Sequence, residues 1–453
     1  MSRRRGTTLC CFVILVWIKV YFIVNERSAT YWKLCRKMDW PHRYWTRRIK
    51  KLGVVVCGGF LLTLLFSLSN ISGKFKFSDS KLRFTSTELD VYAWLNDTTS
   101  FCKGHYTAYG HTFFKLRSAV YDPKKDFFTI QCDEWMWFKK PSTYWFNGNY
   151  APPKYSESLT FVRSKGHDLH NTLKDNNITI VVNREYPHNF YHAMTQWYNI
   201  YVLSRLFKFD MKKVNILLLD HGPVVHIDEQ WKLLFQEVRK SENLTSSIYL
   251  REAIFNIPGH ESPMYYFNLT HLPFVEEFSQ YFLKNFKLKS KETYNCKNLT
   301  ITLILRHDYF MHPGVSNEKR IAERKFKNED ELIAKLKSEF PGHTVQTLIA
   351  EDMSLPEQLS MTSKTDILIG MHGCVLSQTF FLPKHAMVLE MFPNFWEIKM
   401  FFNSLARWRN INHEYWKNDD KRNEYANHYT YVPLSVIEKF AVRARTHFIC
   451  SIH

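Results

Sequence analysis

Short apolar segments alternate with longer amphipathic segments along the chain from about residue 164 onward. Residues 178–182, 214–219 and 248–255 are short runs rich in aliphatic side chains, which predicts strands. Residues 193–206 and 228–238 lie between these runs and have apolar positions at helical spacing, which predicts helices. Strands that alternate with helices indicate an α/β fold.

The second half of the chain repeats this alternation. Strands are predicted at 299–305 and 344–348. Between them, Asn328 is the predicted N-cap of a helix whose first turn holds the acidic residues 329–331. With the strand–helix–strand run at 366–393, these elements predict a second Rossmann-like half.

Residues 366–393 form the most informative run, because they are typical of a strand, a glycine-bounded turn, a short helix and a second strand. Gly370 and Gly373 give the turn a flexible backbone, and a helix that opens near Cys374 offers free N–H groups to an anion such as a diphosphate. His372 lies between the two glycines, within reach of such an anion. An ordinary strand–helix–strand unit, whose glycines only relieve turn sterics, is the alternative.

Three blocks of the chain carry a family resemblance. The blocks are Ile369-Gly-Met-His-Gly373 with Val388-Leu-Glu-Met-Phe-Pro393, Tyr186-Pro-His-Asn-Phe-Tyr-His-Ala-Met-Thr-Gln-Trp197, and Leu303-Ile-Leu-Arg-His-Asp-Tyr-Phe-Met-His-Pro313 with Arg324-Lys325. Together they resemble glycosyltransferase family 61, and the similarity covers about residues 178–416. The His-Ala-Met-Thr-x-Trp pattern in 192–197 is most similar to the β-1,2-xylosyltransferases of N-glycan cores. Three blocks in the family's order are far more specific than one glycine turn.

The resemblance implies a GT-B architecture, with an N-terminal Rossmann-like acceptor domain at 164–295 and a C-terminal nucleotide-sugar domain at 296–453. It implies an inverting enzyme that moves xylose from UDP-xylose to the core β-mannose of N-glycans in β-1,2 linkage. A family 61 N-acetylglucosaminyltransferase acting on protein or O-mannose glycans is one alternative. A non-catalytic glycan-binding paralogue is another, because Gln196 stands where the related xylosyltransferases carry an acid and Cys374 where a small residue is common.

Glycosyl transfer requires positive groups that neutralise the leaving diphosphate. Arg306 follows a predicted strand, and a guanidinium group can hold two phosphate oxygens at once. Glu390 would bind the ribose hydroxyls or face solvent. The sequence has no Asp-x-Asp triad, which favours an enzyme that needs no metal and no cofactor beyond the donor substrate. The predicted donor site consists of Arg306, Arg324, Lys325, Gly370, His372, Gly373 and Glu390.

Transfer also requires a base that removes the proton of the acceptor hydroxyl. His188 and His192 flank Asn-Phe-Tyr at the start of a predicted helix, and a neutral imidazole there suits that role near neutral pH. These two histidines are the predicted catalytic residues. If the acid that Gln196 replaces is catalytic in the family, the role has moved in this chain or its activity is altered.

The N-terminal part of the chain predicts a membrane anchor. Residues 52–69 are an uncharged apolar run with basic residues directly before it, so residues 1–51 would be a cytosolic tail and the rest would be lumenal. A second apolar run at 9–24 is shorter and could be another span. Residues 70–163 would form a stem and an N-terminal extension. A type II protein of the Golgi membrane is expected, with the ER membrane as the alternative.

The formal net charge of +18 is unevenly distributed along the chain. Residues 1–51 hold thirteen Lys or Arg and two acidic residues, so they carry +11 and the remainder only +7. The positive charge of residues 52–453 suits the binding of an anionic nucleotide sugar, and the sequence contains no nucleic-acid-binding motif. The predicted partners are therefore a UDP-sugar, an N-glycan on a glycoprotein and the membrane, but no nucleic acid.

Two features are consistent with an oxidising lumen. Six Asn-x-Ser/Thr sequons lie beyond residue 69, and five cysteines do so as well. Cys102 with Cys132, and Cys296 with Cys450, is a plausible pairing, and Cys374 is the best candidate for a free thiol. No Cys-x-x-Cys or His-Glu-x-x-His spacing indicates a metal site.

Overall fold

The structure is a computed structural model that describes residues 87–110, 112–132, 173–220, 225–308 and 320–448, and the backbone of 159–162 and 310–311. The predicted tail at 1–51, the apolar run at 9–24 and the predicted anchor at 52–69 therefore lie outside the described residues. Within the described part, no helix is both long enough and apolar enough to cross a bilayer.

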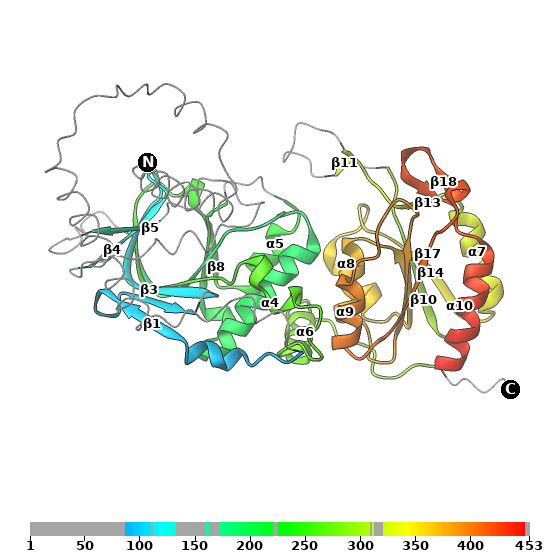
Figure 1. Ribbon diagram of the computed structural model, residues 1–453, viewed down its shortest axis with the longest axis horizontal. Coiled ribbons are helices and arrows are strands. Elements are labelled where there is room, and N and C mark those ends of the chain that lie inside the picture. Colours follow the sequence, from blue (N-terminus) through cyan, green and yellow to red (C-terminus); the bar gives the residue numbers. More distant parts are fainter. Residues whose placement is uncertain are drawn as a thin grey trace, which may run out of the picture. The chain divides into compact units, whose positions relative to one another are not determined.

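The first sheet has nine strands and is mixed (Figure 1). Four of its strands are parallel, in the order β9-β6-β7-β8, and three more continue the sheet antiparallel from β9 as β3, β2 and β1. β4 pairs with β3 and with β5. The strands are β1 (Thr98–Phe101), β2 (Tyr106–Tyr109), β3 (Phe113–Asp122), β4 (Phe127–Gln131), β5 (Leu159–Val162), β6 (Leu173–Val182), β7 (Asn215–Leu218), β8 (Glu237–Lys240) and β9 (Ile248–Phe255).

The second sheet has five strands that are all parallel, in the order β14-β10-β15-β16-β17. Two small sheets accompany it: β11 pairs with β12, and β19 pairs with β13 and β18. The strands of the second half are β10 (Thr300–Leu305), β11 (Phe310–Met311), β12 (Arg320–Ile321), β13 (Lys325–Phe326), β14 (Thr344–Ile349), β15 (Ile367–Met371), β16 (Met387–Phe392), β17 (Asn412–Lys417), β18 (Glu424–Tyr425) and β19 (Tyr429–Thr430).

Helices cover both faces of the five-stranded sheet (Figure 1). Side chains alternate across a strand, so Leu303 and Ile369 pack on the face of α7 and α10, whereas Ile304 and Leu368 pack on the face of α8, α9 and η11. Both faces are apolar because both are buried, as expected for a parallel sheet. The elements are α7 (Glu329–Glu339), α8 (Leu355–Thr362), the 3-10 helix η11 (Cys374–Phe381), α9 (Phe401–Trp408) and α10 (Leu434–His447).

Among the described residues, the α-helices of the first half are α4 (Phe190–Phe207), α5 (Asp228–Leu234) and α6 (Val275–Asn285). α4 begins where the Asn189 side chain accepts a hydrogen bond from the Tyr191 amide, and it ends at Lys208 in the left-handed conformation. Nearly all of its side chains are buried, which explains why it is apolar all round.

The helices of the two sheets share one apolar core. A single cluster includes residues of α4, α6, α8, η11 and α9. Phe282 of α6 stacks on Phe381 of η11 with ring centroids 4.6 Å apart, and the Ser279 hydroxyl donates to the Phe380 carbonyl oxygen at 3.0 Å. These contacts join the helices of the two sheets within one compact unit.

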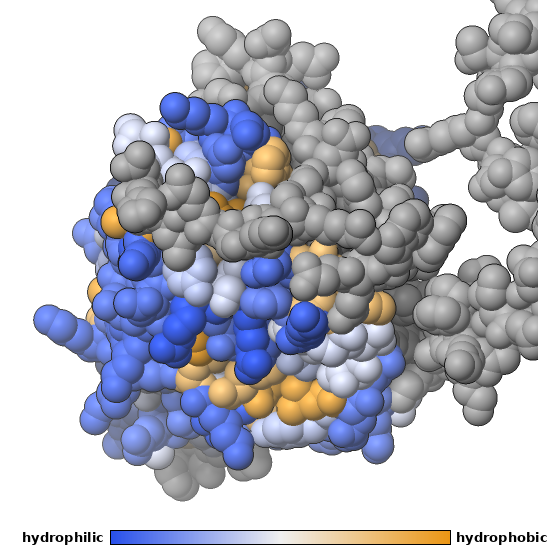
Figure 2. All heavy atoms as spheres, turned by 90° about the vertical axis from the view of Figure 1, so that its left-hand side faces the viewer, coloured by the Kyte–Doolittle hydropathy of each residue, from blue (hydrophilic) through white to orange (hydrophobic). Residues whose placement is uncertain are grey.

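Residues 98–131 lie within the predicted stem and extension at 70–163, and the structure gives them a defined role. β1 to β4 are hydrogen-bonded into the same sheet as β6 and β9. Their inner face forms an aromatic core that includes Tyr121 and Phe128. The side of the first sheet that carries β1 and β3 is mostly hydrophilic, with a small apolar area (Figure 2).

Three local predictions require correction or completion. The helix predicted at 228–238 ends at Leu234, because β8 begins at Glu237 and pairs with β7. The Asn328 side chain does not cap α7; it is buried and exchanges two hydrogen bonds with the Val432 backbone.

The Cys102–Cys132 disulfide is confirmed, and so is the free thiol of Cys374. Cys296 is also disulfide-bonded, whereas Cys450 lies outside the described residues.

Candidate active site

The strand order of the second sheet reverses between β10 and β15. In doubly wound sheets a crevice opens at the carboxyl ends of the two strands on either side of such a reversal, and ligands bind there. Arg306 directly follows β10, and His372 and Gly373 directly follow β15. The topology therefore brings together the arginine and the glycine turn that the sequence placed far apart.

Arg306 and Gly373 are in direct contact. A Cβ atom at Gly373 would overlap the Nη2 of Arg306, so only glycine lets the guanidinium group lie against this backbone. The Arg306 Nη1 donates to the Glu323 carbonyl oxygen at 2.9 Å, and the residue is 8% exposed. Gly373 is thus needed for a close approach and not for turn flexibility, because its φ of 170° is extended.

Gly370 also differs from its predicted role. It lies inside β15, in register with Ile304 of β10, and not in the turn. A Cβ atom there would come within 3.1 Å of the Ile304 Cβ. Gly370 therefore permits close packing of two adjacent strands and offers no loop backbone to a ligand.

Arg324 adds a second guanidinium group to the site. Its Cζ lies 4.0 Å from the ring centroid of Trp396, a cation–π contact that fixes the side chain. Its Nη1 is 3.7 Å from the Glu323 carboxylate. Arg324 and Arg306 both act on His372: burial lowers the pKa of His372 most, and the two positive charges lower it further.

His372 is held by a buried carboxylate. Its Nδ1 is hydrogen-bonded to Glu390 Oε1, while the other oxygen, Oε2, is hydrogen-bonded to His413 Nε2 at 2.8 Å. Glu390 is 0% exposed, and both of its oxygens are engaged. The structure thus contradicts both sequence-based expectations for Glu390: this carboxylate neither faces solvent nor has an open side for ribose hydroxyls.

Aromatic rings surround His372 and connect it to the first half of the chain. The His372 ring lies 4.9 Å from Phe392 and 5.0 Å from Phe402 by centroid. Phe402 and its neighbour Phe401 also contact Tyr191 of α4, at 6.2 and 5.4 Å. This aromatic cluster limits the access of water to His372 and links it to the start of α4.

The predicted catalytic histidines lie at the start of α4, beside the carboxyl ends of β6 and β9. The order of the parallel strands also reverses between β6 and β9, so this is the corresponding crevice of the first sheet. His192 Nδ1 is 3.3 Å from the Tyr265 hydroxyl and 3.9 Å from the Glu185 carboxylate. His188 lies in the loop just before α4 and is half-buried.

His192 belongs to the same aromatic cluster as His372. Its ring makes an edge contact with Tyr191 at 5.9 Å, and Tyr191 contacts Phe402, which in turn contacts His372. The rings of Tyr191 and Phe402 therefore connect His192 of the first half with His372 of the second half.

Gln196 has a structural role in this chain. Its side chain is buried and its Nε2 donates to the Asn183 carbonyl oxygen at 3.0 Å. That bond fixes the end of β6, where the loop to His188 begins. An ionised carboxylate cannot donate, so an acid at this position would need a different partner or a proton.

Arg184 fixes the same loop from the other side. It follows β6 and pairs with Asp220, which follows β7, and with Asp228 of α5. These attractions raise the pKa of Arg184 against the opposing effect of burial. Lys240 of β8 lies 3.4 Å from the Asp228 carboxylate, so two cations face the two carboxylates and the group holds the end of β6 in place.

Lys325 does not join the anion site. Arg324 lies just before β13 with a left-handed backbone (φ 61°), whereas Lys325 is the first residue of the strand and has different contacts. It is 0% exposed, forms an ion pair with Asp308 and lies 4.0 Å from the ring centroid of Tyr429. The predicted basic pair is thus divided, with Arg324 alone beside His372.

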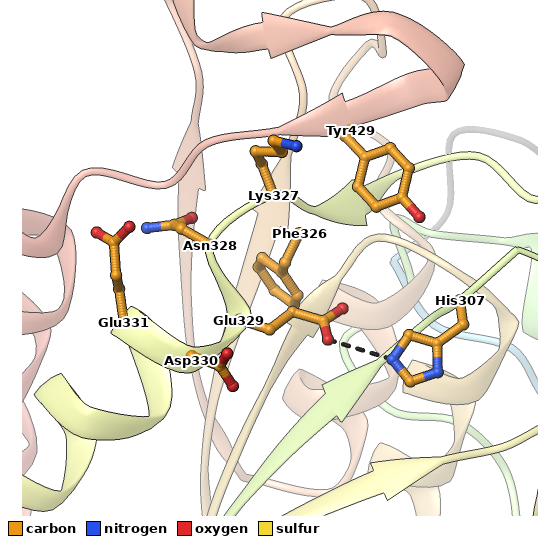
Figure 3. A pocket seen from close by; sticks show the side chains of 8 residues that line it. All are labelled: His307, Phe326, Lys327, Asn328, Glu329, Asp330, Glu331 and Tyr429. Carbon is orange, nitrogen blue, oxygen red and sulfur yellow. Dashed lines mark hydrogen bonds and ion pairs between the residues drawn. The ribbon is translucent and has the colours of Figure 1, made fainter.

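A cavity of about 340 Å³ lies at the start of α7 (Figure 3). His307 projects into it and is 3.2 Å from the Glu329 carboxylate. Burial raises the pKa of Glu329, and His307 opposes this effect. Three carboxylates make the cavity unsuitable for a diphosphate. Its lining consists of His307, Phe326, Lys327, Asn328, Glu329, Asp330, Glu331 and Tyr429.

The sequence reasoning missed His413, Trp396, Phe402 and Tyr265. Only one signal pointed to any of them. Glu390 stands in the apolar run of β16, and a buried carboxylate requires donors, so a partner from a neighbouring strand could have been expected. The aromatic residues carry no local signal, because their roles arise from contacts between distant elements.

Comparison with known proteins identifies the family. The model of the Glycosyltransferase 61 family matches residues 94–389, more than half of the chain. A β-1,2-xylosyltransferase of Oryza sativa subsp. japonica is 23% identical over 260 residues, which cover 51% of this chain and 48% of the relative. A β-1,2-xylosyltransferase of Arabidopsis thaliana is 21% identical over 301 residues, covering 58% and 54%.

A second group of relatives has a different stated activity. An EGF domain-specific O-linked N-acetylglucosamine transferase of Drosophila melanogaster is 36% identical over 106 residues, which cover 22% of this chain and 19% of the relative. The chain spans about half the length of the xylosyltransferases it matches. Among solved structures, a family 9 glycosyl transferase from Veillonella parvula covers 62% of this chain and 99% of its own at 9% identity, with a TM-score of 0.30. That score is too low to establish a common fold.

Proposed function

The chain belongs to glycosyltransferase family 61, and on that premise we propose that it is an inverting enzyme that transfers xylose from UDP-xylose to the core β-mannose of N-glycans. One observation carries the proposal. Arg306 and Arg324 converge beside His372 at the β10/β15 reversal, where Gly373 leaves room for the Arg306 guanidinium.

The donor diphosphate would lie against these two guanidinium groups. Both are partly buried and held by neighbouring groups, so their charges are pre-oriented for the negative charge that develops as UDP leaves. Two sheets with such reversals support a GT-B arrangement, in which donor and acceptor occupy the crevices of different halves. The acceptor would then approach from the side of His192.

The reaction is a displacement at the anomeric carbon of the sugar. The acceptor oxygen forms a bond to this carbon, the bond to the diphosphate oxygen breaks, and UDP leaves with the electron pair. A histidine accepts the proton of the acceptor hydroxyl. His192 and His188 on the acceptor side were predicted for this step, and the structure adds His372 as a further candidate.

We propose that transfer needs no metal ion, because the two guanidinium groups supply positive charge where other transferases use a cation. A chelator should then leave the rate unchanged.

The enzyme alternative is an N-acetylglucosaminyltransferase that acts on protein. The local identity of 36% to the fly enzyme favours it as the second candidate. Gln196 keeps a third reading open, a paralogue that binds glycans without turnover. The hydrogen bond from Gln196 to the Asn183 carbonyl oxygen weakens that reading, since it gives the amide a structural role at the end of β6.

The proposed site of action is the lumen of the Golgi, with residues 52–69 as a type II anchor and the ER as the alternative. The Cys102–Cys132 disulfide supports an oxidising compartment.

Mass spectrometry of a trimannosyl N-glycan tests the proposal. The glycan and an EGF-domain peptide are incubated separately with the purified protein and each of UDP-xylose, UDP-N-acetylglucosamine and UDP-galactose, with and without chelator. We expect a pentose gain on the glycan from UDP-xylose in both conditions.

Other results would redirect the proposal. A gain from UDP-N-acetylglucosamine on the peptide would support the second candidate. Binding of UDP without any transfer would support the non-catalytic reading. Loss of transfer with chelator would contradict only the metal-independent step.

A further inference from the structure

We propose that Glu390 and His413 are positioning residues that hold His372 with its Nε2 free to accept the proton of the acceptor hydroxyl. The catalytic part of this inference rests on the proposed transferase function. Its structural part, the proton positions on two histidines, can be measured without any substrate.

The carboxylate of Glu390 determines where both rings carry a proton. An ionised carboxylate only accepts hydrogen bonds, so each ring nitrogen that contacts it must be an N–H. His372 therefore carries its proton on Nδ1, and His413 carries one on Nε2. The buried position of Glu390 leaves this carboxylate no solvent hydrogen bonds as an alternative.

Asn403 of α9 fixes the charge of His413. The Asn403 Nδ2 is 3.2 Å from His413 Nδ1. An amide N–H₂ group only donates, so Nδ1 must be an acceptor and His413 must be neutral. A neutral His413 leaves the negative charge of Glu390 uncompensated on that side, and this charge is available to stabilise a proton on His372.

The remaining nitrogen of His372 is then a base. With Nδ1 protonated, a neutral ring has its lone pair on Nε2, and this atom makes no hydrogen bond within the described part of the chain. Burial and the two guanidinium groups lower the pKa of His372, which favours the neutral ring. A neutral ring of this tautomer cannot donate to a phosphate, so His372 suits proton transfer better than the predicted role in binding the diphosphate.

The proposed step balances as follows. The acceptor hydroxyl transfers its proton to His372 Nε2 while its oxygen bonds to the anomeric carbon, and the bond between this carbon and UDP breaks. His372 becomes an imidazolium that Glu390 stabilises through Nδ1. Later loss of the proton to solvent restores the neutral ring. In this arrangement a carboxylate orients the base, as in other hydrogen-bonded acid–base pairs, and a second histidine in turn orients the carboxylate.

Nitrogen-15 NMR of the full chain with labelled histidine tests the proton positions first. The His372 and His413 signals are assigned by their loss in His372→Gln and His413→Gln. At neutral pH we expect His372 protonated on Nδ1 alone and His413 on Nε2 alone. A proton on His372 Nε2, or a charged His413, would overturn the proposal whether or not the protein transfers sugar.

Kinetics test the consequence. Glu390→Gln should lower kcat about 10- to 100-fold, the usual loss for a group that orients another, with the donor KM changed less than about twofold, because Glu390 does not touch the donor. His413→Phe should also lower kcat, because it removes the N–H that donates to Glu390. His413→Gln keeps an N–H donor, so its kcat should be close to that of the wild type.

Two kinetic outcomes would contradict the proposed positioning of His372 by Glu390 and His413. Equal rates for His413→Gln and His413→Phe would show that the donated proton is irrelevant. A loss confined to the donor KM would place Glu390 in donor binding. If the wild-type chain transfers no sugar, the proposed function fails, and the NMR result alone decides the arrangement of Glu390, His372 and His413.

Discussion

At the residue scale, the site depends on two buried charges of opposite sign, the carboxylate of Glu390 and the guanidinium of Arg306. Sequence reasoning identified both positions through the family blocks, but it assigned Glu390 to the donor. The error has a physical cause. An acid near the end of a predicted strand is expected to be exposed, whereas Glu390 lies inside β16 and accepts a hydrogen bond from His413 of β17, more than twenty residues later.

Gly373→Ala tests the close approach of Arg306. The added methyl group would displace the guanidinium, so UDP affinity should fall about 10- to 100-fold, the range expected for losing a charge-assisted hydrogen bond. Isothermal titration calorimetry measures the change. Cys374→Ala is the control, because it is a small substitution of a free cysteine next to Gly373. It should change UDP affinity less than about twofold. An unchanged affinity in Gly373→Ala would separate Arg306 from donor binding.

The pH dependence of kcat/KM tests the base. If His372 is the proton acceptor, the acid limb lies below its ordinary pKa of about 6.5, because burial, Arg324 and Arg306 all lower its pKa and Glu390 opposes them only in part. Arg324→Met removes one positive charge, which raises the pKa of His372, so the limb should move to higher pH.

The exposed Arg422 provides a matched control for that experiment. It pairs only with Asp420 among the described residues, so Arg422→Met should leave the pH profile in place. A limb that moves to lower pH in Arg324→Met would contradict the assignment of His372.

At the element scale, the periodicity of side chains predicted most strands and helices of both halves. It predicted β7, β9, β10 and β14 to within one residue at either end. It failed where two elements follow without a break, as at α5 and β8, and where a lone side chain serves a distant element, as with Asn328. Lys325 is the first residue of the two-residue strand β13, whereas Arg324 lies just before it, and no sequence pattern marks so short a strand.

The Cys102–Cys132 disulfide should stabilise the outer strands of the first sheet. It closes a loop with a sequence separation of 30, so replacing both cysteines with serine should cost about 2–4 kcal/mol in the free energy of unfolding. Urea unfolding measures this cost, and Cys374→Ala is again the control. UDP affinity of the folded variant should be unchanged, because the donor site lies in the second sheet. An equal stability of variant and wild type would contradict this role.

At the scale of the whole molecule, the family blocks and the alternating pattern predicted an α/β chain with two halves. The mixed nine-stranded sheet was not predicted, because antiparallel pairing of β3 with β9 joins residues about 130 positions apart. The topology then explains why Arg306 and Gly373 lie in contact, since the reversal between β10 and β15 places the carboxyl ends of these two strands side by side.

Glycosylation tests the proposed lumenal location. Asn243, Asn268 and Asn298 are exposed, so protein made in a secretory host should carry glycans there. Asn177 lies within β6 and donates to Gln236, and a glycan would compete with this bond, so it should stay unmodified. Peptide mass spectrometry after enzymatic deglycosylation reads each site. Unmodified asparagine at Asn243, Asn268 and Asn298 alike would contradict a lumenal domain.

The most direct test of the central claim is a calorimetric titration of UDP into the wild-type chain, Arg324→Met and Arg422→Met. We expect wild type and Arg422→Met to bind with the same affinity and Arg324→Met to bind at least about tenfold more weakly, because a charge-assisted contact to the diphosphate is lost. Equal affinities in all three proteins, or no binding to the wild type, would contradict a nucleotide-sugar site at the β10/β15 reversal.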